Sequence, residues 1–62
     1  MKKPVCKLIG ANGNVFNLIG LAKTALKKAG MTTEASEMVK RCFAAGSYGE
    51  ALNIISEYVT VR

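Results

Sequence analysis

The amino-acid sequence predicts an α+β fold, a small βαααβ unit whose three helices pack on a short two-stranded sheet formed by the terminal segments. Three segments repeat apolar residues at helical spacing, glycines and capping residues separate these segments, and both chain ends carry short apolar or β-branched runs. Because 62 residues suffice for one domain at most, residues 1–62 are expected to form a single domain.

The first element is a predicted strand over residues 4–9. Its apolar run includes Val5 and Leu8 and follows Pro4, and proline is tolerated at the start of a strand because it lacks only one ladder donor. The next segment, residues 10–14, is rich in glycine and asparagine and favours a tight turn.

A first helix is predicted from its cap at Asn14 to Gly30, a residue suited to the left-handed position that ends helices. The apolar residues of this segment share one arc of about 120°: Val15, Leu18, Ile19, Ala22, Ala25, Leu26 and Ala29. Phe16 and Leu21 lie outside this arc, so they are candidates for a second contact surface.

A second helix is predicted between Thr32 or Thr33, as candidate caps, and Gly46. Glu37 and Arg41 have the spacing of an ion pair along one helix. The residues expected on the buried face are Ala35, Met38, Val39, Cys42, Phe43 and Ala45.

A third helix is predicted to begin at Ser47, which forms a capping box with Glu50. Its apolar side comprises Ala51, Leu52, Ile55, Tyr58 and Val59. Residues 59–62 alternate β-branched and polar side chains, which predicts a strand that pairs with the first one. Two short strands leave exposed edges, and the core is small, so a homodimer or higher oligomer is expected.

Basic residues gather in the first half of the chain. Residues 1–30 carry six lysines and no acidic residue, whereas residues 31–62 carry three basic residues and four glutamates. This asymmetry indicates an acidic ligand or head-to-tail contact between copies, and a solvated face is the alternative. The candidate partner-binding residues are Lys23, Lys27, Lys28, Phe16 and Leu21.

The loop before the first helix is a candidate anion or nucleotide site, because backbone N–H groups at a helix start hold phosphates. Its residues are Lys7, Gly10, Asn12, Gly13 and Asn14. The loop matches neither the P-loop nor the GxGxxG pattern, and the alternative is a turn with a helix cap.

Composition argues against an enzyme, since the chain has no His and no Asp to accept a proton. Cys6 and Cys42 lack the spacing of a metal site and are expected to be buried structural thiols, so no metal or cofactor is predicted. No segment has the length of a membrane span or of a signal-peptide core, which predicts a cytoplasmic protein.

Nucleic-acid binding is a weaker alternative. The second and third predicted helices superficially resemble a helix-turn-helix. The segment 47–58 that would read the duplex carries Glu50 and Glu57 and no basic residue, which argues against contact with phosphates.

Several short motifs resemble a family of small uncharacterised bacterial and phage proteins. They are Lys7-Leu8-Ile9-Gly10, Asn12-Gly13-Asn14 with Phe16, Ile19 and Gly20, Leu26-Lys27-Lys28-Ala29-Gly30, Gly46-Ser47-Tyr48 and Tyr58-Val59-Thr60-Val61. In that family Asp commonly stands where this chain has Asn12 and Ser47. The resemblance implies a phage or mobile-element protein that binds a host component stoichiometrically, including inhibitors of host defence.

Together these observations predict a small, basic, non-enzymatic accessory protein that binds a host component with an acidic surface. Expression from a phage would place it in the cytoplasm of the host cell. The alternatives are a module that sequesters nucleotides or oligonucleotides and a nucleic-acid-binding protein.

Overall fold

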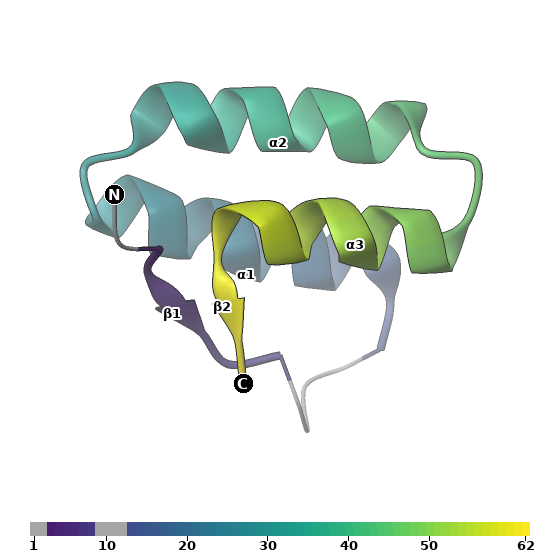
Figure 1. The fold of residues 1–62 in the computed structure, drawn as a ribbon, viewed down its shortest axis with the longest axis horizontal. Coiled ribbons are helices and arrows are strands. Elements are labelled where there is room, and N and C mark those ends of the chain that lie inside the picture. Colours follow the sequence, from purple (N-terminus) through teal and green to yellow (C-terminus); the bar gives the residue numbers. More distant parts are fainter. Residues whose placement is uncertain (1–2, 9–12) are drawn as a thin grey trace.

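The computed structural model describes residues 3–8 and 13–62 and confirms the predicted order of strand, three helices and strand (Figure 1). The elements are β1 (Val5–Cys6), α1 (Val15–Lys28), α2 (Thr32–Ala44), α3 (Tyr48–Tyr58) and β2 (Thr60–Val61). The α+β class is therefore as predicted.

The two strands pair in parallel, with Val5 beside Thr60 and Cys6 beside Val61. The Thr60 N–H donates to the carbonyl oxygen of Pro4 at 2.8 Å. Parallel strands need a long crossover connection, and here the three helices provide it.

The first strand is shorter than predicted. Regular pairing covers Val5–Cys6 rather than residues 4–9, because β2 itself spans only two residues and offers few ladder groups. The Leu8 N–H still donates to the carbonyl oxygen of Arg62 at 2.6 Å. Ile9 lies outside the described residues.

Both predicted ends of α1 are confirmed. The Asn14 side chain accepts a hydrogen bond from the Phe16 N–H at 2.8 Å. At the other end Gly30 has a φ of 78°, a conformation that residues with a Cβ rarely adopt. The Gly30 N–H donates to Lys27 and the Met31 N–H donates to Leu26, the two bonds of a Schellman motif.

This motif explains why the predicted caps of α2 are wrong. Met31 stands at the cap position and makes no side-chain capping bond, while Thr32 is already helical. Because the turn after α1 holds the Met31 N–H and packs its half-buried side chain on the core, the chain enters α2 one residue early. The helix also ends at Ala44, before Gly46.

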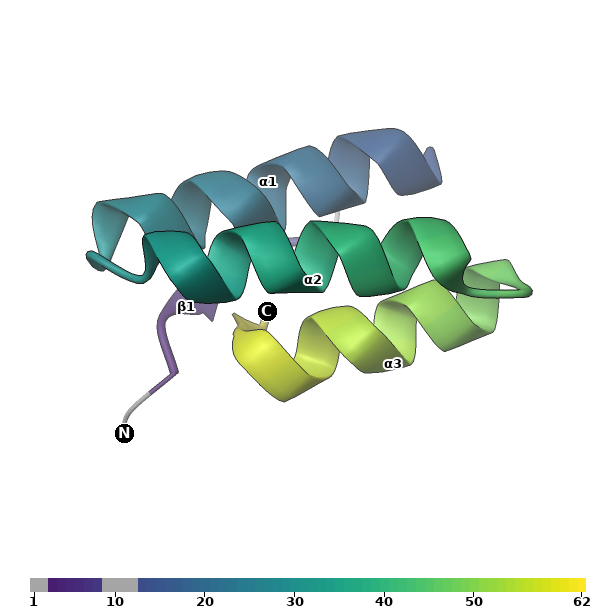
Figure 2. The same ribbon diagram turned by 90° about the horizontal axis from the view of Figure 1, so that it is seen from above.

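The helices form two layers over the strands. The strands lie on one side of α1 and α3, and α2 covers the opposite side (Figures 1 and 2). Leu26, Met38, Ile55 and Val59 are the largest fully buried side chains. Among the described residues no helix is long and apolar enough to cross a bilayer.

Both cysteines are buried, and neither forms a disulfide. Burial raises the pKa of the Cys6 and Cys42 thiols, which keeps them protonated. Cys42 lies in the core beside α3, where its Sγ is 3.8 Å from the carbonyl oxygen of Ala51. The burial agrees with the predicted structural role.

Candidate functional site

The structure does not bring the five predicted partner-binding residues together at one place. Phe16 lies at the start of α1 against Phe43 of α2. Lys23 and Lys27 line a hollow between α1 and α2. Lys28 and Leu21 line a separate groove between α1 and β1.

The Phe16 and Phe43 rings form an exposed pair. Their centroids lie 5.7 Å apart at an interplanar angle of 36°, and the two residues are 63% and 62% exposed. Burying such a side chain is worth roughly 1.5–3 kcal/mol, so leaving two of them together in solvent forgoes much of the available stabilisation. Clustered exposed apolar residues mark interaction sites.

The sequence-based placement of Phe43 on the buried face is wrong. Met38 and Cys42 of α2 do point into the core, but the first turn of α1 covers less than half of the Phe43 side chain. Which face of α2 is buried therefore depends on where the neighbouring helices begin, and the periodicity of α2 does not contain that information.

Tyr48 extends the aromatic end and holds it in place. It is 46% exposed and lines a hollow of about 270 Å³ together with both phenylalanines. Its hydroxyl donates to the carbonyl oxygen of Gly13 at 2.8 Å, which ties the start of α3 to the segment before α1.

The predicted cap of α3 is confirmed with one change. The Ser47 hydroxyl accepts a hydrogen bond from the Glu50 N–H at 3.2 Å. The Glu50 carboxylate accepts from the Gly46 N–H at 2.7 Å, one residue before the donor of a standard capping box.

The second feature is a basic hollow between α1 and α2. Lys23 and Lys27 reach it from α1 and Lys40 reaches it from α2, beside the hydroxyl-bearing Thr32 and Ser36, around a volume of about 310 Å³. No carboxylate is among the residues that line it. Within residues 3–8 and 13–62, none of the three lysines forms a salt bridge.

The Phe16–Phe43 pair and the basic hollow lie on the same surface of the molecule. Along α1, Lys23 follows Phe16 by seven residues, which is close to two helical turns, and Lys27 follows by eleven. On α2, Lys40 precedes Phe43 by three residues. We call this surface the α1–α2 face and define it by Phe16, Lys23, Lys27, Lys40 and Phe43.

On the other side of α2, the charged residues bind each other. The Arg41 guanidinium donates to both carboxylate oxygens of Glu57 at 2.9 and 3.2 Å and to the Tyr58 hydroxyl at 3.2 Å. The Tyr58 hydroxyl donates to Glu37 at 2.7 Å. We call this network the α2–α3 seam.

The seam corrects the predicted pairing within α2. Arg41 pairs with Glu57 of α3 rather than with Glu37, because the bidentate geometry to Glu57 satisfies two guanidinium donors at once. The hydrogen bond from Arg41 lowers the pKa of Glu57 below its ordinary value of 4.5.

The predicted anion-binding residues are only partly described. Gly10 and Asn12 lie outside the described residues. The Asn14 side chain caps α1, the Gly13 carbonyl accepts from Tyr48, and Lys7 lies in the groove between β1 and α1. Of the predicted alternatives, the helix cap at Asn14 is therefore present, and the turn before it lies outside the described residues.

Lys40, Phe43 and Tyr48 are the residues of these surfaces that the sequence did not indicate as binding residues. In the sequence, only its positive charge could have indicated Lys40 as a binding residue. The lysines beside it, Lys23 and Lys27, come from another helix. Within the described ranges, no three His, Cys, Asp or Glu side chains lie together as a metal site would require.

Comparisons of the chain with known protein families, with curated proteins and with solved structures find no match. The family resemblance stays a prediction.

Proposed function

We propose that this protein is a non-enzymatic binding module that associates stoichiometrically with a partner protein through the α1–α2 face. The exposed Phe16–Phe43 pair carries the proposal. Aromatic side chains held on rigid elements dominate the binding energy of many interfaces, because they bury a large area and lose few rotamers. Here the two rings are carried by two helices, α1 and α2, and the Tyr48 hydrogen bond ties the start of α3 to the segment before α1.

The lysines define the charge of the partner. Lys23 lies about 10 Å and Lys27 about 16 Å along α1 from Phe16, at 1.5 Å of rise per residue. A matching partner presents an apolar side chain and, at that separation, a cluster of carboxylates. Attraction between the lysines and such a cluster speeds encounter and sets the orientation.

The resemblance to small phage and bacterial proteins implies that the partner is a host protein, and inhibition of host defence would be the consequence of binding. The direct test is capture of proteins from a bacterial lysate on the immobilised protein. We expect one acidic protein at near-equal molar ratio, retained less strongly as the salt concentration rises because charge attraction is screened.

Two variants test the face separately. Phe16→Ala combined with Phe43→Ala removes the anchor, and Lys23→Gln, Lys27→Gln and Lys40→Gln together remove the charge. A matched control, Val61→Ala with Arg62→Gln, instead removes an exposed apolar side chain from β2 and the charge of the residue that follows it. Loss of the captured protein in the first two variants and not in the control supports the proposal, and equal capture by all four proteins contradicts it.

Sedimentation equilibrium on the protein alone separates a partner from a second copy. The sequence predicts a homodimer or higher oligomer from its exposed strand edges and small core, and the exposed aromatic pair is a further candidate surface for such self-association. A monomer at tens of micromolar contradicts that oligomer. A dimer that Phe16→Ala with Phe43→Ala dissolves assigns the aromatic end to self-association.

A nucleotide is the second candidate ligand, favoured by one observation. The hydroxyl-bearing Thr32 and Ser36 line the same hollow as three lysines, which is the chemistry that holds a phosphate group. Thermal unfolding with about 1 mM ATP or a cyclic nucleotide tests it, since a ligand of the folded state raises the melting temperature. An unchanged melting temperature would contradict nucleotide binding.

A further inference from the structure

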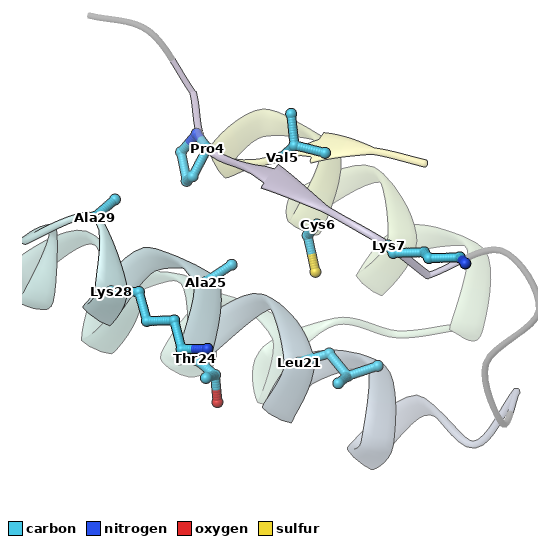
Figure 3. A pocket seen from close by; sticks show the side chains of 9 residues that line it. All are labelled: Pro4, Val5, Cys6, Lys7, Leu21, Thr24, Ala25, Lys28 and Ala29. Atoms are coloured by element: carbon cyan, nitrogen blue, oxygen red, sulfur yellow. The ribbon is translucent and has the colours of Figure 1, made fainter.

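A groove of about 560 Å³ runs between β1 and α1, away from the α1–α2 face (Figure 3). Residues 4–7 form one side of it. The other side is formed by Leu21 and Ala25 of α1 and by Ala29, which follows the helix. The helix residues at this position are mostly small, so the space beside the strand stays open.

The strand side of the groove is an unpaired sheet edge. The main-chain bonds to β2 use Pro4, Cys6 and Leu8, every second residue. The main-chain groups of Val5 and Lys7 therefore point away from β2, and they form no hydrogen bond with any described residue. Such an edge offers donors and acceptors to one more strand.

The side chains leave this edge accessible. Figure 3 shows the Val5 side chain pointing away from α1 and the Cys6 side chain pointing toward the helices. Cys6 is buried, and Leu21 on the helix side is 37% exposed. An extended chain placed here would bond to the edge and lay alternate side chains over Leu21 and Ala25, the arrangement of strand addition.

The lysines that line the groove indicate the charge of the segment that would bind there. Lys28 and Lys7 line the groove and lie toward its opposite ends in Figure 3, and no acidic residue lines it. A second copy that added its own β1 in antiparallel fashion around Val5 would place Lys3 of one copy opposite Lys7 of the other. Like charges directly opposite each other destabilise a strand pair, so an acidic segment fits and a second β1 does not.

We propose that the groove between β1 and α1 binds an extended peptide segment of another protein, which adds to β1 as a third strand. The segment carries apolar residues at its centre and acidic residues at both ends. The site is separate from the α1–α2 face, and the two proposals stand or fall independently.

A defined peptide tests the site. The probe is the blocked heptapeptide Glu-Thr-Val-Thr-Val-Thr-Glu, titrated to about 1 mM into isotopically labelled protein and followed by nuclear magnetic resonance, since short-peptide affinities in this range are measurable. We expect the amide signals of Val5 and Lys7 to shift and to exchange more slowly with solvent. A peptide with Lys in place of both Glu should bind about tenfold more weakly.

Proline substitutions provide a matched pair. Val5→Pro removes an outward N–H from β1, and Val61→Pro removes the equivalent N–H from the opposite edge of β2, so neither deletes a bond between the strands. We expect Val5→Pro to weaken peptide binding about tenfold, because the peptide strand loses its hydrogen bond with the Val5 N–H. We expect Val61→Pro to leave peptide binding unchanged. On the unaltered protein, N-methylation of the central peptide residues should abolish binding.

Each of the following results would overturn the proposal: no shift at Val5 and Lys7 at the highest peptide concentration, equal binding of the peptide and its N-methylated form, or a protein dimer that Val5→Pro dissolves. The dimer would assign the edge to a second copy. Shifts confined to the α1–α2 face would also overturn it, while leaving the proposed function intact.

Discussion

The two flanks of α2 use their charges in opposite ways. On the α3 flank, Arg41 binds Glu57 and Tyr58, and Tyr58 binds Glu37, so the charges satisfy one another within the chain. On the α1 flank, Lys23, Lys27 and Lys40 surround a hollow without a carboxylate, next to an exposed aromatic pair. The charges of the α2–α3 seam are satisfied within the fold, whereas those of the α1–α2 face point to solvent, which is why we propose the α1–α2 face as the binding surface.

Two consecutive residues of α2 reach different flanks. Lys40 and Arg41 are consecutive, but each step along a helix turns by about 100°, so one side chain joins the basic hollow and the other reaches α3. Net charge alone would count these two residues together. Their surroundings differ: Arg41 pairs with Glu57, whereas no carboxylate lines the hollow that Lys40 lines.

The largest effect on stability is expected from a change in the buried core that lies under both flanks of α2. Met38 of α2 is fully buried beneath them, so Met38→Ala should lower the free energy of unfolding by about 2–5 kcal/mol through lost burial and a cavity. Urea denaturation measures the change. A loss below about 1 kcal/mol would mean that the core under α2 is not the common support of the two flanks.

The next largest effect is expected for Phe43→Ala, which should reduce partner affinity much more than it reduces the free energy of unfolding. Because the side chain is 62% exposed, Phe43→Ala should change the free energy of unfolding by less than about 1 kcal/mol. The same change should cost about 2 kcal/mol or more of partner affinity, as for other aromatic anchors. Urea denaturation and titration calorimetry with the captured partner check the two values. A variant that loses stability and keeps affinity would reverse the roles of the flanks.

A smaller effect should appear at the seam, and it should depend on pH. Arg41 lowers the pKa of Glu57, so the pair stabilises the folded state above the ordinary carboxyl pKa, and this stability is lost as the pH falls through the lowered pKa. The melting temperature of Arg41→Gln should therefore lie slightly below that of the original protein at neutral pH. The gap should close in acid, and a gap that widens there would contradict the assignment. The pair is exposed, which keeps the effect small.

The smallest effect is expected on the basic flank. Lys23→Gln, Lys27→Gln and Lys40→Gln together should leave the melting temperature within about 3 °C of the original value, because these lysines have no carboxylate to lose. Removing like charges from one surface would, if anything, raise it. A clear drop in the calorimetric scan would show that the lysines stabilise the fold.

Local signals made most of the fold predictable from the sequence. Asn14 and Ser47 cap helices through their own side chains, and Gly30 adopts a conformation that favours glycine over other residues. These features depend on a few neighbouring residues. The caps at Thr32 and Thr33 were wrong because the turn after α1 determines the entry into α2.

The candidate sites were less predictable because they depend on contacts between distant segments. The sequence indicated Phe16 but could not show that Phe43 lies against it in solvent. It grouped Lys28 with Lys23 and Lys27, whereas the fold sends Lys28 to the β1 groove and brings Lys40 in from α2. The parallel pairing that leaves the edge of β1 open is likewise a property of the assembled chain.

We propose that the α1–α2 face binds the partner and that the α3 side does not. Photo-crosslinking inside the cell that expresses the protein distinguishes the two sides. One variant carries p-benzoylphenylalanine in place of Phe43, and the other carries it in place of Asn53, an exposed residue of α3. We expect one discrete crosslinked protein from position 43 and none from position 53. Crosslinking of the same protein from position 53 alone would contradict it.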